Sequence, residues 1–173
     1  TGLTPNTEYE LLVFGCQAGA PTTKLNRLKF TTLDTVYADL DFELEIGDYY
    51  DGSAVAAINP DYAAFEGTVI VGITANVDSS ATNIYYTAMN ALDYPYYTYE
   101  QLIEGLVAEG AAETTGLYAF EFVEPYIFFG VAEDEDGNYT KVWSSKEITF
   151  TKASCSPAEE FFTANASAQQ LKA

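Results

Sequence analysis

The sequence predicts an all-β fold of two β-sandwich units in tandem, the first of them incomplete. Three observations predict this fold class: apolar and polar residues alternate in several β-rich runs, turn residues separate those runs, and one pair of strands near the start recurs near the end. With 173 residues, the chain has room for one sandwich of roughly 100 residues and part of another, or for two small domains.

The first predicted element is a β-hairpin within residues 1–32. One strand covers residues 9–16, turn residues follow at 19–21, and the second strand covers residues 24–32. The first strand has apolar residues on both faces, and a two-stranded hairpin alone is marginal in water. We therefore expect missing strands, the tail of the chain or another molecule to complete it.

A linker over residues 33–38 leads to the second unit, residues 39–152. The first strand of that unit, residues 39–46, alternates carboxylates with apolar residues, so the apolar set should face a core. Neighbouring carboxylates on one face of a strand lie roughly 7 Å apart, too far to share one Ca²⁺. We interpret them as charges that protect an edge strand from pairing with other chains.

The middle of the second unit contains two further strands. Residues 47–66 predict a long connection with at most a short strand, because Tyr, Asp, Gly, Ala and Pro dominate there. The β-rich runs 68–77 and 83–89 should either pair as a hairpin or lie in different sheets.

One helix interrupts the β pattern. Apolar residues recur at helical spacing over residues 99–109, Thr98 is a suitable cap and Gly110 a suitable stop, which predicts a short inserted helix. The tail, residues 153–173, has the composition of a helix or linker, and Ser-Pro-Ala-Glu-Glu at 156–160 resembles a helix start.

The remaining strands repeat the first hairpin. Residues 118–123 form one strand, and residues 126–132, a turn at 134–138 and strand residues within 141–151 match the strand-turn-strand order of residues 9–32. The Asp-Glu-Asp-Gly-Asn turn lacks the Gly and Glu that an EF-hand loop needs at its sixth and twelfth positions, so we interpret it as a hairpin turn.

The Leu-x-Pro-x-Thr-x-Tyr run at residues 3–9 resembles the loop and strand start near the end of a fibronectin type III domain. The resemblance implies an immunoglobulin-like sandwich in which the ring of Tyr9 is packed and its hydroxyl bonds to nearby backbone, as in a tyrosine corner. The second hairpin has Phe-Val-Glu-Pro-Tyr at 122–126 instead, so the motif does not assign the same role to Tyr126.

Residues 39–151 resemble the modified fibronectin type III-like modules of surface and secreted proteins of gut Bacteroidetes. Three motifs carry this likeness: Tyr50-Asp51-Gly52, Asn59-Pro60-Asp61-Tyr62 and Asp134-Glu135-Asp136-Gly137-Asn138-Tyr139. The resemblance implies an extracellular or cell-surface location, including that of an outer-membrane lipoprotein whose anchor lies outside this segment.

The charge of the chain is strongly negative. It has 26 acidic and 7 basic residues, for a formal net charge of −19, and there is no Lys or Arg between residues 30 and 140. Such a charge repels phosphate backbones and anionic membrane surfaces, so we expect no nucleic acid among its partners. A solvated, self-repelling surface explains it better than a site for a cation or a basic partner.

The sequence offers no catalytic or metal-binding constellation. It contains no His, which excludes a Ser-His-Asp or Cys-His nucleophile system within the chain, and Cys16 and Cys155 are too few for a zinc site. Free, buried thiols are the default for both cysteines, and carboxylate pairs occur without any mark of a cleft. We expect no enzyme activity, no cofactor and no metal, and no apolar run is long enough for membrane insertion.

Exposed aromatic residues are the candidates for ligand contact. Tyr94, Tyr96 and Tyr97 are clustered beside the predicted helix, and Trp143 lies on a late strand. The predicted function is a non-catalytic extracellular β-sandwich module that acts as a spacer or a protein-interaction or adhesion element, with a protein or glycan partner. The alternatives are a carbohydrate-binding module that uses these four aromatics, and an accessory domain of a secreted protease or glycoside hydrolase.

Overall fold

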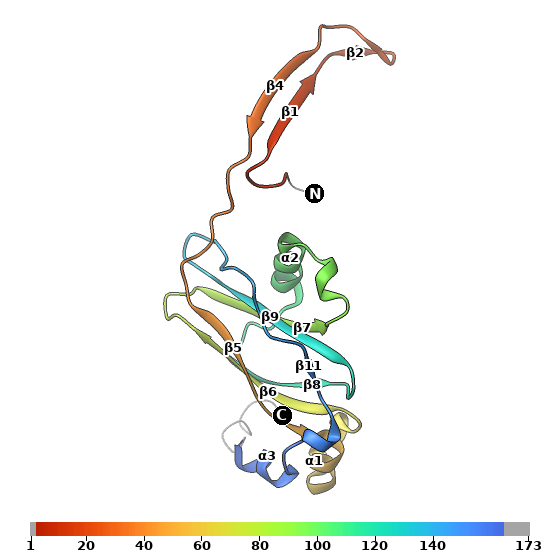
Figure 1. Cartoon of the computed structure of the whole chain (residues 1–173), viewed down its shortest axis with the longest axis vertical. Helices are drawn as coiled ribbons and strands as arrows, with labels where there is room; N and C mark the ends of the chain where they lie inside the picture. Colours follow the sequence, from red (N-terminus) through yellow and green to blue (C-terminus); the bar gives the residue numbers. More distant parts are fainter. Residues whose placement is uncertain (1–2, 165–173) are drawn as a thin grey trace. The chain divides into compact units, whose positions relative to one another are not determined.

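The computed structural model describes residues 3–164 of the chain (Figure 1). The chain divides into two compact units, unit 1 (Thr1–Tyr37) and unit 2 (Ala38–Ala173). Strands in antiparallel sheets dominate both units, with a few short helices, so the β-rich fold class is confirmed.

Unit 1 is a β-hairpin. Strand β1 (Glu8–Val13) pairs antiparallel with β4 (Asn26–Thr31), and the short strands β2 (Cys16–Gln17) and β3 (Ala20–Pro21) pair at the tip. The tip turn contains Ala18 and Gly19 with φ of 48° and 82°. Positive φ at both central residues is the geometry that a two-residue hairpin loop favours.

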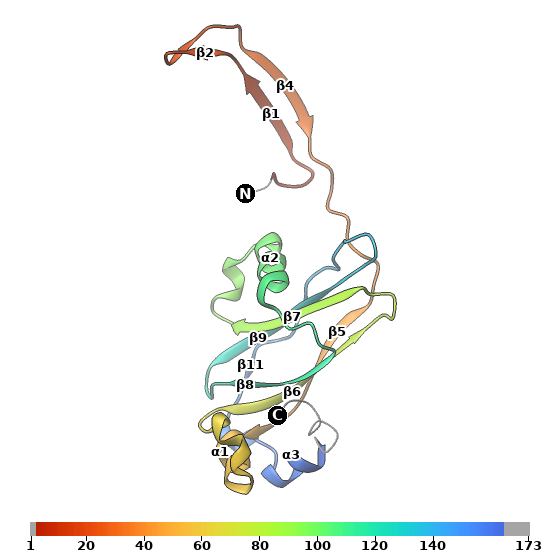
Figure 2. The ribbon, with the colours of Figure 1, turned by 180° about the vertical axis from the view of Figure 1, so that it is seen from behind.

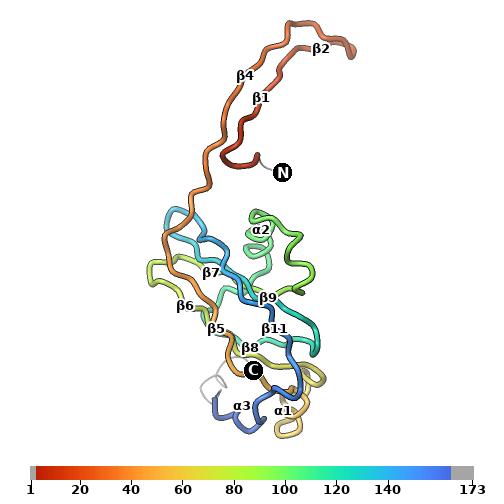
Figure 3. The backbone as a smooth tube through the Cα atoms, viewed as in Figure 1, coloured from red at the N-terminus to blue at the C-terminus, as the bar shows by residue number. Residues whose placement is uncertain are grey.

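Unit 2 contains two antiparallel sheets, which Figure 3 traces along the backbone. The first sheet has the order β5-β6-β8, and the second has β9 at its centre, with β7 on one side and β10 and β11 on the other. The strands are β5 (Phe42–Asp51), β6 (Val69–Val77), β7 (Asn83–Asn90), β8 (Thr115–Phe120), β9 (Pro125–Glu133), β10 (Trp143–Ser144) and β11 (Ile148–Thr149). Of the two arrangements expected for residues 68–77 and 83–89, the structure shows strands in different sheets.

The two sheets of unit 2 share one apolar core. Alternate residues of β6, including Val71 and Ile73, contact Tyr86 and Phe128 of the other sheet, and Phe150 lies among them. Strand β5 contributes Leu44 and the partly buried Phe42 and Ile46, and Leu40 just before the strand packs against the same core, while Glu43 and Glu45 are exposed. The apolar residues of the predicted strand 39–46 therefore face the core as expected, although the strand begins at Phe42, and β5 is an edge strand.

The predicted long connection at residues 47–66 is wrong. Strand β5 continues to Asp51, where helix α1 (Gly52–Ile58) begins, and the 3₁₀ helix η1 (Pro60–Phe65) follows. Asp51 caps α1 by accepting a hydrogen bond from the Ser53 backbone N–H at 2.9 Å, and Asn59 caps η1 in the same way. Unit 2 therefore has more than the single inserted helix that the sequence predicted.

The inserted helix is confirmed as α2 (Tyr99–Glu109). Thr98 and Gln101 form a capping box, in which the Thr98 N–H donates to Gln101 Oε1 at 2.9 Å and the Gln101 N–H donates to Thr98 Oγ1 at 3.4 Å. Leu102 and Leu106 pack against Phe129 and Val131 of β9. These contacts place α2 on the face of the β7–β9 sheet that points away from the other sheet (Figure 2).

Helix α3 (Ala158–Ala164) packs beside α1 at one end of unit 2 (Figure 1). Its fully buried Phe161 lies 5.3 Å from the ring of Tyr50 and 5.1 Å from the ring of Tyr62. The predicted helix start in the tail is confirmed, and residues 165–173 of the predicted tail lie outside the described residues.

Both hairpins contain the same hydroxyl-to-backbone bond. The Thr4 N–H donates to the hydroxyl of Tyr9 at 2.8 Å, and the Glu121 N–H donates to the hydroxyl of Tyr126 at 3.2 Å. In each case the donor lies five residues before the tyrosine. The bond that the motif predicted for Tyr9 is present, and Tyr126 makes it without the motif.

Candidate interaction surfaces

One face of the hairpin in unit 1 is apolar. In the β1–β4 register Tyr9 lies opposite Phe30 and Leu11 lies opposite Leu28, with Val13 next on the same face. We call these five residues the apolar hairpin face. The Tyr9 and Phe30 rings stack with centroids 5.9 Å apart, yet the side chains stay open to solvent, Leu11 at 49% and Leu28 at 59% exposure.

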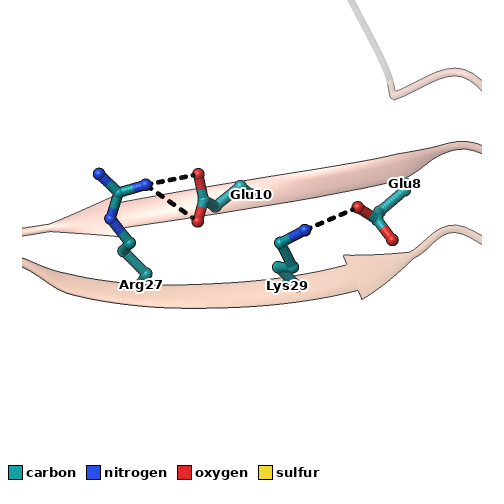
Figure 4. A network of polar contacts seen from close by, with 4 residues as sticks. All are labelled: Glu8, Glu10, Arg27 and Lys29. Carbon is teal, nitrogen blue, oxygen red and sulfur yellow. Dashed lines mark hydrogen bonds and ion pairs between the residues drawn. The ribbon is translucent and has the colours of Figure 1, made fainter.

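The opposite face of the hairpin is charged (Figure 4). Arg27 pairs with Glu10 at 3.1 Å and Lys29 pairs with Glu8 at 3.1 Å across the strands. Leu12, opposite Arg27, belongs to this charged face. The expectation that both faces are apolar is therefore wrong, because Glu8 and Glu10 of β1 form ion pairs with basic residues of β4 on the face that holds Leu12.

Unit 1 differs from unit 2 in charge. Its three acidic and three basic residues cancel, whereas residues 38–164 hold 23 acidic and three basic residues. Exposed ion pairs such as those of the hairpin contribute roughly 0–1 kcal/mol each. The hairpin thus presents a neutral unit with an exposed apolar face, which makes this face a candidate contact surface.

The four aromatic candidates do not form one platform. Tyr94 packs against Phe129, with centroids 5.4 Å apart, and Trp143 packs against the core between the sheets. Tyr96 is 84% exposed and Tyr97 is 48% exposed, both at the 3₁₀ helix η2 (Tyr94–Tyr96) or directly after it. Only Tyr96 and Tyr97 are therefore placed to stack on a ligand.

The turn after β9 is closed by an Asp side chain. Asp134 Oδ1 accepts hydrogen bonds from the backbone N–H groups of Asp136 and Asn138, at 3.0 and 2.8 Å, and Gly137 has a φ of 79°. The predicted hairpin turn is confirmed. In residues 3–164, no group of three or more His, Cys, Asp or Glu is arranged to hold a metal ion.

Acid should remove the contribution of Asp134 to stability. Its hydrogen bonds, first that from the Asn138 backbone, lower the pKa of this carboxyl below its usual range. A lowered folded-state pKa means that the stabilisation is complete at neutral pH and is lost as pH falls through the folded-state pKa. We expect Asp134→Ala to lower the melting temperature at pH 7 and to have a smaller effect at pH 2.

Asp136→Ala is the matched control for this prediction, because Asp136 is exposed and contributes its backbone N–H, not its carboxylate, to the described turn. Thermal melts at pH 7 and pH 2 would compare the two variants. An Asp134→Ala effect of equal size at both pH values would contradict the role of the ionised carboxylate.

Both cysteines are free thiols. Cys155 is half-buried, and burial raises the pKa of its thiol above the usual range. Cys16 is exposed on β2, so the expectation that both thiols are buried is wrong for Cys16. Within residues 3–37, no further sheet packs against the hairpin to bury Cys16.

No helix within residues 3–164 is both long enough and apolar enough to cross a membrane. Comparison with known proteins gives no family, no curated protein and no solved structure that matches this chain. The functional argument therefore depends on the surfaces described above.

Proposed function

We propose that this chain is a non-catalytic β-sandwich module of a bacterial surface or secreted protein, acting as a spacer and protein-interaction element. The strand order of unit 2 supports a fibronectin type III-like identity. If β5 to β11 are lettered along an immunoglobulin-like sandwich, strands A, B and E form one sheet and C, F and G the other. Helix α2 lies in the chain where strand D would be.

The matching tyrosine bonds support the same proposal. A tyrosine corner lies near the start of strand F, and Tyr126 is the second residue of β9, the strand lettered F. Tyr9 is the second residue of β1, so β1 and β4 correspond to strands F and G of a first copy. In a sandwich the inner face of such a hairpin packs on an opposite sheet.

The apolar hairpin face is the observation that carries the interaction role. Its occupant is the apolar face of another β-sheet, because sheets pack face to face through side chains of this kind. In a pure sample the available sheet is that of a second copy. Two copies of the neutral unit 1 repel each other less than two copies of the acidic unit 2 would.

The contact between two copies should be weak. Two six-residue strands present a face of roughly 20 by 10 Å, or about 200 Å² per copy. Stable interfaces bury at least about 1,200 Å² in total, so we expect a dissociation constant above roughly 10 μM. A sheet with more strands would be a tighter partner.

Sedimentation velocity between about 10 μM and 1 mM tests this proposal at the concentrations that a weak interface requires. We expect the wild-type chain to self-associate and Leu11→Glu to remain monomeric, because a carboxylate on the apolar face would have to lose its water.

Leu12→Glu is the matched control. Leu12 adjoins Leu11, has a similar exposure of 48%, and lies on the charged face opposite Arg27. The Leu12→Glu variant should self-associate as the wild type does. A wild-type chain that stays monomeric at 1 mM, or equal loss in both variants, would refute the proposed use of this face.

Carbohydrate binding is the second candidate, since Tyr96 and Tyr97 are exposed side by side in the chain. Tyrosine rings can stack on sugar faces. A glycan array with wild type and the Tyr96→Ala and Tyr97→Ala variants would test it, with lost signal in the variants as the expected result. No signal from the wild-type chain would remove this candidate.

A further inference from the structure

The two edges of the β5-β6-β8 sheet differ in protection. The edge strand β5 carries the exposed carboxylates Glu43 and Glu45. The other edge strand, β8, has the sequence Thr-Gly-Leu-Tyr-Ala-Phe, without charge or proline. Charges and prolines are the usual means by which proteins prevent an edge strand from pairing with another chain. Strand β8 lacks both.

The backbone of β8 points its free groups away from the sheet. The Ala75 N–H donates to the Thr114 carbonyl at 2.8 Å, which fixes the phase of the β6–β8 ladder. Because hydrogen-bonded pairs alternate in an antiparallel ladder, Tyr118 bonds to β6 and its neighbours Leu117 and Ala119 direct their N–H and C=O groups outward. These outward groups form an open edge.

A pocket of about 330 Å³ lies beside this edge, between the two sheets. Its walls come from β6, β7, β8 and the end of α2, and include Ile73, Tyr86, Ala88, Glu109, Tyr118 and Phe120. The edge of β7 on the other side is partly covered, because Tyr86 exchanges backbone hydrogen bonds of 3.0 and 2.8 Å with Ala111. Strand β8 is therefore the edge beside the pocket with which another strand can pair.

The lining of the pocket favours an apolar side chain. Ala88, Phe120 and Ile73 provide apolar walls, and the hydroxyls of Tyr86 and Tyr118 bond to each other at 2.8 Å, which uses one of their two O–H donors. Glu109 adds a carboxylate, and unit 2 around it is strongly acidic. An acidic surface attracts basic segments.

We infer that the β8 edge binds an extended, basic segment of a partner protein by strand addition, with one apolar side chain of that segment in the pocket. Main-chain hydrogen bonds give such binding its affinity, and the pocket gives it selectivity. The place is the one that strand D occupies beside strand E in constant-type immunoglobulin sandwiches. This site is separate from the apolar hairpin face.

The probe is an acetylated, amidated octapeptide of alternating Lys and Val. Amide hydrogen exchange followed by NMR should show fast exchange at Leu117 and Ala119 in the free protein, and protection of at least about tenfold at millimolar peptide. An octapeptide of alternating Glu and Val should give no protection, since it meets the acidic surface with like charge.

Ala119→Pro removes one outward N–H donor and should weaken binding of the Lys-Val peptide about tenfold or more. Ala119→Ser keeps that donor and should bind as the wild type does. Ala88→Leu fills the pocket while it leaves the edge intact, and should also weaken binding, so a failure of Ala119→Pro to fold would not remove the test.

Protection of Leu117 and Ala119 that rises with protein concentration alone would show that a second copy occupies the edge, and would overturn the inference. Equal protection by the Glu-Val peptide, or unchanged binding in both Ala119→Pro and Ala88→Leu, would also overturn it. Leu11→Glu should not affect this binding, so the result is independent of the proposed role of the hairpin.

Discussion

Phe150→Ala is expected to lower the free energy of unfolding of unit 2 by about 3–5 kcal/mol. Phe150 is fully buried between the sheets, with ring centroids 4.9 Å from Tyr49 and 5.8 Å from Phe120. Removing its ring leaves a cavity in a region where aromatic groups from several strands meet, and the surrounding backbone can relax only partly. This loss is a large part of the 5–15 kcal/mol typical of whole domains.

Chemical denaturation followed by tryptophan fluorescence would measure this loss, since Trp143 packs against the same core. Leu92→Ala is the control, because Leu92 is largely exposed and its truncation should change stability by less than about 0.5 kcal/mol. A Phe150→Ala loss below about 1.5 kcal/mol would contradict the placement of Phe150 in a close-packed core.

Gly130→Ala is expected to destabilise unit 2 by about 3 kcal/mol, although it adds a single methyl group. A Cβ at Gly130 would lie 2.7 Å from the carbonyl oxygen of Tyr85 and 2.8 Å from Cζ of Phe42. The carbonyl belongs to the paired strand β7, so the clash can be relieved only by moving the β7–β9 ladder. Strand β9 is the centre of its sheet, which makes such a movement costly.

Gly72→Ala is the matched control in the centre of the other sheet. A Cβ at Gly72 would meet only Cδ2 of Leu117, at an ordinary 3.9 Å. We expect it to be neutral or stabilising by a few tenths of a kcal/mol, because alanine restricts the unfolded chain. Equal effects of the two substitutions in denaturant titrations would contradict the close approach of β7 to Gly130.

Local patterns predicted several elements because each pattern contains its own physical cause. The alternation at residues 39–46 needs only one buried face to predict a strand. The helix at 99–109 was predicted from its apolar spacing and from Thr98, whose hydroxyl forms half of the capping box. In both cases the decisive residues are neighbours in sequence.

Other features depend on partners that are distant in sequence. The Ala-rich helix α1 was missed because its stability comes from packing of Val55 with Tyr50 and Phe161. The charged face of the hairpin depends on Arg27 lying opposite Leu12, which only the register shows. The open edge of β8 depends on sheet order, and no residue within β8 indicates it.

Methyl NMR of Leu11, Leu12 and Leu28 across a concentration series would test most directly whether the apolar hairpin face is a contact surface. Leu11 and Leu28 lie opposite each other on that face, and Leu12 points to the charged face. We predict that the methyl signals of Leu11 and Leu28 shift progressively from 10 μM to 1 mM, the range of a weak interface, while those of Leu12 stay unchanged. Signals that stay constant for all three residues, or that shift equally for Leu12, would contradict the proposed function.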